Sequence, residues 1–186
     1  RSEAEQRRRC SFSARAWQRA VLAAAMALWF AAQPLSGAPW HQGCLLCVCG
    51  AVMASGVVCD LRARMIPLEC CAALLIAGGA YQLLRHGLIG IAEGAVAATA
   101  VLAVCWTANR IARKSGGSVG FGDIRCMTAL AFACGPATLL GAAACYVSAC
   151  AFSIVWMLTH RLGRRDGIPM APFLSIWLAV GTTVLG

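Results

Sequence analysis

A series of seven apolar stretches, separated by short polar segments, constrains the fold most strongly. They cover about residues 21–32, 41–59, 67–84, 88–108, 124–134, 137–159 and 169–185. Several of them approach the roughly 20 residues that a membrane-spanning helix requires. Only 12% of the residues are charged, whereas soluble domains carry about 25%. The sequence therefore predicts an all-α, polytopic membrane helix bundle of about seven transmembrane helices.

The placement of the cations predicts the orientation of this bundle. With the N-terminus inside, 15 of the 16 Lys and Arg residues fall on the cytoplasmic side and only Arg85 falls outside. Lys and Arg are retained on the cytoplasmic side of membranes, so we expect a multi-pass protein of the inner or plasma membrane with a cytoplasmic N-terminus. The net charge of +9 does not indicate nucleic acid, because the bases are spread over several predicted loops. Contact with membrane lipids, whose anionic headgroups attract cations, accounts for them.

Three regions are expected along the chain. Residues 1–19 form a basic cytoplasmic N-terminal segment, residues 20–40 an extra N-terminal transmembrane helix, and residues 41–186 the main membrane domain. The small residues of Leu35-Ser36-Gly37-Ala38 resemble a signal-peptidase site, so the alternative to a retained first helix is a cleaved signal peptide. We favour the retained helix.

Two aspartates fall at the same predicted membrane boundary, in a chain with only seven acidic residues. Asp60 ends the second apolar stretch, and Asp123 follows a glycine-rich turn and begins the fifth. An ionisable group at membrane depth is a functional candidate by default, because its burial is costly. Simpler alternatives exist for each: an ion pair of Asp60 with Arg62 or Arg64, and a helix N-cap for Asp123.

Paired carboxylates indicate a specific chemistry. Two carboxyl groups brought together share one proton, because like charges at close range do not both ionise. The ionised member can take a proton from water while the protonated member polarises a peptide carbonyl, as in aspartic proteases. A glycine-rich wall beside them gives an unwound substrate backbone room to approach.

Three motifs resemble those of one enzyme family, the type IV prepilin peptidases and archaeal preflagellin peptidases. The first runs from Asp60 through Leu61-Arg62-Ala63-Arg64-Met65-Ile66 to Pro67, the second is Gly120-Phe121-Gly122-Asp123 with Arg125, and the third is Pro169-Met170-Ala171-Pro172-Phe173. The resemblance covers about residues 44–186. It implies that Asp60 and Asp123 are the catalytic pair of a Gly-x-Gly-Asp intramembrane peptidase. The residues that it implies in substrate binding or in shaping the site are Gly120, Gly122, Pro67, Arg125, Pro169 and Pro172.

By this likeness the chain is an aspartic endopeptidase that removes the short basic leader of prepilin or pseudopilin-like proteins of type IV pili and protein secretion. The likeness also implies cleavage at the cytoplasmic membrane face, after a glycine that precedes the substrate's hydrophobic helix. Two positions depart from the family pattern, where Leu68 replaces an Asn and Arg125 a Lys. Nothing resembles the paired Cys-x-x-Cys motifs of the bifunctional members, so we expect the short form, without N-methyltransferase activity.

Other kinds of protein share some of these sequence features. A presenilin-like protease shares the Gly-x-Gly-Asp motif, but the segment from Asp60 to Pro67 argues against it. A small membrane transporter or a scaffold without peptidase activity is the alternative from another class, although transporters often show internal repeats and the chain shows none. Cys44-x-x-Cys47 has zinc-like spacing, but no second pair completes a four-ligand site. No metal and no cofactor are expected.

The predicted orientation can be tested with a cysteine placed in the glycine-rich turn. Ser118→Cys should be shielded from membrane-impermeant thiol reagents in intact cells, because the turn is predicted to face the cytoplasm. The parent protein, with its native cysteines, measures the background. Labelling of the variant from outside, above that background, would contradict the orientation.

Overall fold

The computed structural model describes residues 39–63, 65–114, 120–158 and 170–183. These residues form the helices α3 (Trp40–Ala63), α4 (Leu68–Lys114), α5 (Phe121–Cys134), α6 (Thr138–Leu158) and α7 (Ala171–Thr183), with a short 3-10 turn η2 (Gly135–Ala137) between α5 and α6. The predicted all-α class is confirmed. Residues 1–38, which include the basic segment and almost all of the predicted first helix, lie outside the described residues.

Within the described residues, three stretches are long and apolar enough to cross a membrane. They are Trp40–Asp60, Leu68–Lys114 and Phe121–Val155, and α7 is a shorter apolar helix. The second stretch contains a sharp kink, so it does not cross in a single pass. The count of seven spans stays a prediction.

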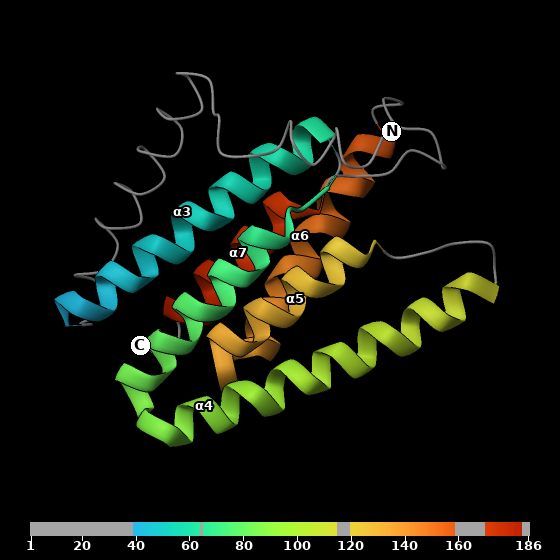
Figure 1. The fold of residues 1–186 in the computed structure, drawn as a ribbon. Helices are drawn as coiled ribbons and strands as arrows, with labels where there is room; N and C mark the ends of the chain where they lie inside the picture. Colours follow the sequence, from blue (N-terminus) through green and yellow to red (C-terminus); the bar gives the residue numbers. More distant parts are fainter. Residues whose placement is uncertain (1–38, 64, 115–119, 159–169, 184–186) are drawn as a thin grey trace, which may run out of the picture.

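A single residue reverses the chain between the predicted third and fourth stretches. Both stretches belong to α4, which is broken at Gly87 (φ 65°, ψ −145°). Glycine adopts this positive φ without the steric cost that other residues carry. Figure 1 shows the second arm of α4 turning away from the first at this kink, at the lower left.

The second arm of α4 is longer than the sequence predicts. It continues to Lys114, so that Arg110, Arg113 and Lys114 lie on the helix and not in a loop. Cations in the last turns of a helix interact favourably with the partial negative charge at its C-terminus. This interaction explains why the helix extends beyond its apolar stretch.

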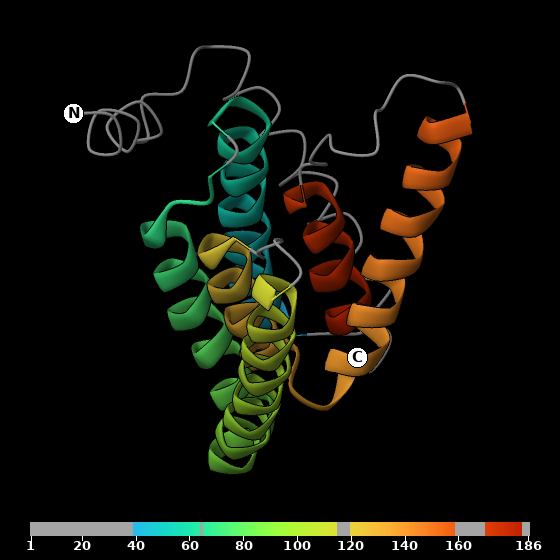
Figure 2. The same cartoon turned by 90° about the vertical axis from the view of Figure 1, so that its right-hand side faces the viewer.

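The short helix α7 lies at the centre of the described bundle. Its side chains Leu174, Trp177 and Leu178 are fully buried, and Figure 2 shows α7 between α6 on one side and α3, α4 and α5 on the other. The outside of the bundle is apolar, with Ile76, Leu88 and Leu139 among its exposed side chains. An extensive apolar exterior is typical of a membrane interaction surface.

Small residues let α4 approach α5 closely. A Cβ added to Gly78 would lie only 2.9 Å from the Cα of Ala133, and one added to Gly94 would lie 2.6 Å from the carbonyl oxygen of Phe132. Helix interfaces in membrane proteins are enriched in small residues for this reason. The close contact fixes α5, which carries Asp123, against α4.

The Gly78 contact generates a test of this packing. Gly78→Ala should lower the free energy of unfolding by about 1–3 kcal/mol, because the added methyl group overpacks a backbone contact. Gly56→Ala on α3 is the matched control, since its Cβ would meet only the Ile66 side chain at 3.9 Å. Thermal unfolding of both purified variants in detergent checks the difference. Equal midpoints for the two variants would contradict the contact.

Candidate active site

Asp60 lies in the last turns of α3 and is only 5% exposed. Its Oδ2 accepts a hydrogen bond from the backbone N–H of Ala171, at 3.0 Å. Ala171 is the first residue of α7, and the carbonyl oxygen of Met170 accepts the N–H groups of Phe173 and Leu174. The N–H of Ala171 has no acceptor within its own helix, so Asp60 satisfies it. A carboxylate at this position also benefits from the positive end of the helix dipole.

Asp123 is half-buried and lies in the first turn of α5. The N-cap of α5 is Gly120, in an extended conformation and without a side-chain capping bond, and its carbonyl accepts the N–H of Ile124 at 3.2 Å. The simpler reading of Asp123 as the N-cap is therefore wrong. The helix starts earlier than the apolar run because Phe121 and Gly122 extend its first turn. This leaves the Asp123 carboxylate without a capping role.

Two of the sequence motifs meet at Gly122. A Cβ added there would lie 3.4 Å from the carbonyl oxygen of Ile66 and 3.5 Å from its backbone nitrogen. The Gly-x-Gly-Asp turn therefore packs on the segment between Asp60 and Pro67. Through this contact, the first turn of α5, which carries Asp123, lies against the segment that follows Asp60. Together with the bond from Ala171, this contact brings all three motifs to one end of the bundle.

Gly120 lies close to the carboxylate of Asp123. A Cβ at Gly120 would lie 3.1 Å from Oδ2 of Asp123. Any side chain there would crowd this oxygen, so the glycine keeps one side of the carboxylate open. The two glycines that the resemblance singled out thus have separate structural roles. Gly122 permits the close contact of α5 with Ile66, and Gly120 leaves access to Asp123.

The remaining predicted site residues have fewer described contacts with the two aspartates. Pro67 stands directly before α4, one position earlier than predicted, and its carbonyl accepts the N–H of Cys71 at 3.4 Å. Arg125 is exposed on α5, and Pro172 is half-buried at the second position of α7. Pro169 lies outside the described residues. The side chains of Arg62 and Arg64 lie outside them too, so their ion pair with Asp60 stays untested.

Several groups near the aspartates were not found by sequence reasoning. The N–H of Ala171 is one, although the prolines around it mark a helix start. Cys126, one turn after Asp123, directs its thiol to the sulfur of Met53 on α3, at 4.0 Å. The hydroxyl of Tyr146 on α6 contacts the sulfur of Met127, one turn after Asp123 on α5, at 3.6 Å. No sequence pattern marks a tertiary contact such as that of Tyr146.

The cysteines that suggested zinc lie on one helix. On α3, Cys44 is exposed, whereas Cys47 and Cys49 are buried in the apolar packing. Over residues 39–63, 65–114, 120–158 and 170–183, no group of three or more His, Cys, Asp or Glu side chains is arranged to hold a metal ion. In this part of the chain, the buried thiols act as small apolar groups.

Comparison with known proteins identifies the family. The model of the type IV leader peptidase family matches residues 44–184. The chain belongs to this family. No curated protein and no solved structure matches it. The matched range contains all three motifs, so the resemblance inferred from them is confirmed at the level of the family, and the described helices are those of a leader peptidase.

The bond between α7 and Asp60 can be tested by removing its donor. Ala171→Pro deletes one N–H at the first position of the helix, where proline is well tolerated. Peptidase activity should fall about tenfold or more, because a hydrogen bond to a buried charge is lost. Ala171→Gly keeps the N–H and serves as the control. A proline variant that folds and cleaves as well as the glycine variant would show that the bond is dispensable.

Proposed function

We propose that this leader peptidase is an intramembrane aspartic endopeptidase with Asp60 and Asp123 as its catalytic pair. It removes the short basic leader of a prepilin or pseudopilin-like protein at the cytoplasmic face of the inner or plasma membrane. The meeting of the two aspartate motifs, which come from helices far apart in the sequence, carries this proposal. The packing of Gly122 on Ile66 supports it, because it brings the two aspartate motifs together.

The surroundings of the two carboxylates support different roles. Asp60 accepts a backbone N–H at the start of α7, so its Oδ2 is held as a hydrogen-bond acceptor. Asp123 lies in the first turn of α5, where Gly120 is the N-cap. We therefore assign the charge to Asp60 and the shared proton to Asp123, a division typical of carboxylate pairs in unlike environments.

The reaction follows from this assignment. Asp60 takes a proton from a water molecule while the water oxygen attacks the scissile carbonyl carbon. Asp123 donates its proton to the carbonyl oxygen, so the tetrahedral intermediate forms without a net change in charge. Collapse of the intermediate returns a proton to Asp123, and the other proton passes from Asp60 to the leaving nitrogen as the C–N bond breaks.

The open side of the site suits an extended substrate. Gly120 bears no side chain, so a peptide backbone can approach Asp123 there. Phe121 is exposed at the same place, with the guanidinium of Arg113 above its ring at 5.6 Å. Glu69 is exposed in the first turn of α4 and adds a negative charge at this end. A basic leader segment would be attracted to that charge.

Membership in a peptidase family leaves the transporter or scaffold hypothesis without support. We further propose that the protein lacks N-methyltransferase activity. Its Cys44-x-x-Cys47 pair lies on an apolar helix, with Cys47 buried, and does not resemble the paired motifs of the bifunctional members.

Substitution of the aspartates tests the catalytic pair. Asp60→Asn and Asp123→Asn should each abolish leader cleavage, because an amide keeps the shape of the side chain but neither accepts nor shares the proton. The double variant should be no worse than either single one, since the two groups act as a unit. Asp60→Glu should lose on the order of a hundredfold, because the longer side chain displaces the carboxylate by about 1 Å or more.

The measurement is cleavage of a prepilin substrate in membranes that contain equal amounts of each variant. Asp166→Asn is the control. This residue follows Arg164 and Arg165 in the polar segment between the sixth and seventh apolar stretches, so we expect a solvated loop charge that contributes little. An Asp60→Asn enzyme that cuts at a near wild-type rate would refute the aspartic mechanism, while leaving the family membership intact.

A further inference from the structure

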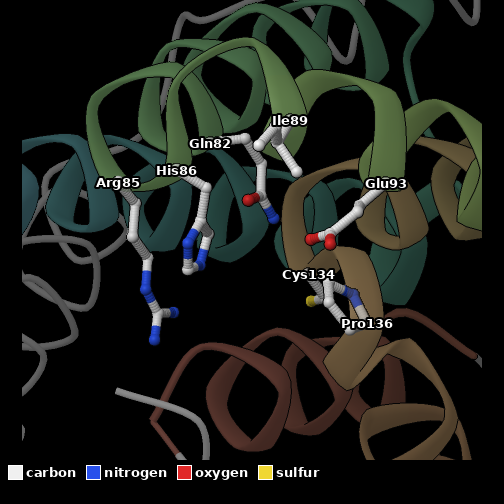
Figure 3. A pocket seen from close by; sticks show the side chains of 7 residues that line it. All are labelled: Gln82, Arg85, His86, Ile89, Glu93, Cys134 and Pro136. Carbon is white, nitrogen blue, oxygen red and sulfur yellow. The ribbon is translucent and has the colours of Figure 1, made fainter.

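A second site lies at the end of the bundle opposite the two aspartates. A cavity of about 340 Å³ opens where α4 kinks and α5 ends. Its lining residues are Gln82, Arg85, His86, Ile89, Glu93, Cys134 and Pro136 (Figure 3). Asp123 and Cys134 are eleven positions apart on α5, which separates this cavity from the catalytic end by about 16 Å at 1.5 Å per residue. The volume is within the range of small-molecule sites.

The floor of this cavity holds a buried polar group that is only partly satisfied. Gln82 is 2% exposed, and its Nε2 donates to the carbonyl oxygen of Ala133 at 2.8 Å. Its Oε1 is buried and has no hydrogen-bond partner among the described residues. A buried acceptor that lacks a donor carries an unfavourable desolvation cost. The bond to Ala133 gives Nε2 a role, because it caps the C-terminal end of α5, but it gives none to Oε1.

Two glycines leave room for the Gln82 carboxamide. A Cβ on Gly90 would lie 3.2 Å from Oε1 of Gln82, and one on Gly135 would lie 2.8 Å from its Nε2. Gly135 also has a positive φ of 53°. Larger residues at either position would push into the carboxamide. Figure 3 shows this group projecting into the space between His86 and Glu93.

Opposite charges face this space from its two sides. Arg85 and His86 lie on one side and Glu93 on the other (Figure 3). The Arg85 guanidinium donates to the Tyr81 hydroxyl at 3.0 Å and lies over the Tyr81 ring at 5.8 Å, which fixes it beside the cavity. A guanidinium presents several donors in a planar fork that matches phosphate oxygens, so contact with Tyr81 is compatible with binding an anion.

We propose that this cavity binds a phospholipid headgroup that carries both a phosphate and a primary ammonium, as in phosphatidylethanolamine. The phosphate lies against Arg85 and His86, and the ammonium donates hydrogen bonds to the Glu93 carboxylate. A primary ammonium donates hydrogen bonds to a carboxylate such as that of Glu93, whereas a quaternary ammonium has none to donate. The site is distinct from the peptidase site and does not depend on its chemistry.

The surroundings of the cavity favour a membrane lipid over a soluble compound of the same charges. Leu84, Leu88 and Ile89 are 51%, 81% and 70% exposed beside the charged groups. They belong to the arms of α4 on either side of the Gly87 kink. Acyl chains can lie along these side chains while the headgroup enters the polar cavity. A soluble ligand would leave this apolar surface uncovered.

Lipid competition on the purified full-length protein tests the proposal. The protein in detergent receives equal amounts of phosphatidylethanolamine, phosphatidylcholine and phosphatidylglycerol with identical acyl chains, and native mass spectrometry counts the retained lipids. We expect retention of phosphatidylethanolamine over both others. Glu93→Gln should reduce this preference about tenfold, as expected for one lost charge-assisted hydrogen bond. Arg85→Lys should weaken retention several-fold, because the planar fork is lost.

Glu69→Gln is the matched control, because it makes the same change on α4 at the opposite end of the bundle and should leave lipid retention unchanged. Glu93 is exposed, so its substitution leaves the core intact, and a thermal midpoint for each variant verifies folding. A further arm adds glycerophosphoethanolamine, which has the headgroup without acyl chains. If it displaces the lipid at equal concentration, the headgroup chemistry holds but a soluble compound is the source. Equal retention of the three lipids, or a preference that survives Glu93→Gln, overturns the proposal.

Discussion

The hydrogen bond from Ala171 to Asp60 joins positions 111 residues apart and solves two problems at once. A buried carboxylate needs a donor, and the first N–H of a helix needs an acceptor. Since α7 also places Leu174 and Trp177 in the core, the position of Asp60 is tied to the packing of the whole bundle. A defect in the docking of α7 would therefore reach the proposed catalytic pair without a change to either aspartate.

Much of this architecture could be predicted from local chemistry. Apolar stretches of membrane length fixed the helical class, and the break expected between residues 84 and 88 coincides with the kink at Gly87. Because successive transmembrane helices run in opposite directions, the predicted topology was sufficient to place Asp60 and Asp123 at the same end of the bundle. The helix ends were less accurate, because α4 gains its last turns from Arg113 and Lys114, whose charges favour a helix C-terminus.

The contacts between helices could not be predicted in the same way. The donor to Asp60 is a backbone N–H, which any residue except proline supplies, so the identity of Ala171 carries no signal. The cavity around Gln82 depends on Gly90 and Gly135 meeting one side chain from two directions. Such a meeting depends on how α4 and α5 cross. Arg85 and Glu93 could therefore be read from the sequence only as isolated charges near a membrane boundary.

The connections at the two ends of the bundle are very unequal. At the end opposite the aspartates, Gly87 alone joins the arms of α4, and the three residues Gly135–Ala137 join α5 to α6. Turns this tight have no room for added residues, because each backbone angle is set by the helices on either side. The longer connections, between α3 and α4, α4 and α5, and α6 and α7, all begin or end beside the aspartate motifs. Among helices α3 to α7, insertions are therefore accommodated more easily at the end that carries the aspartate motifs than at the Gly87 and Gly135–Ala137 turns.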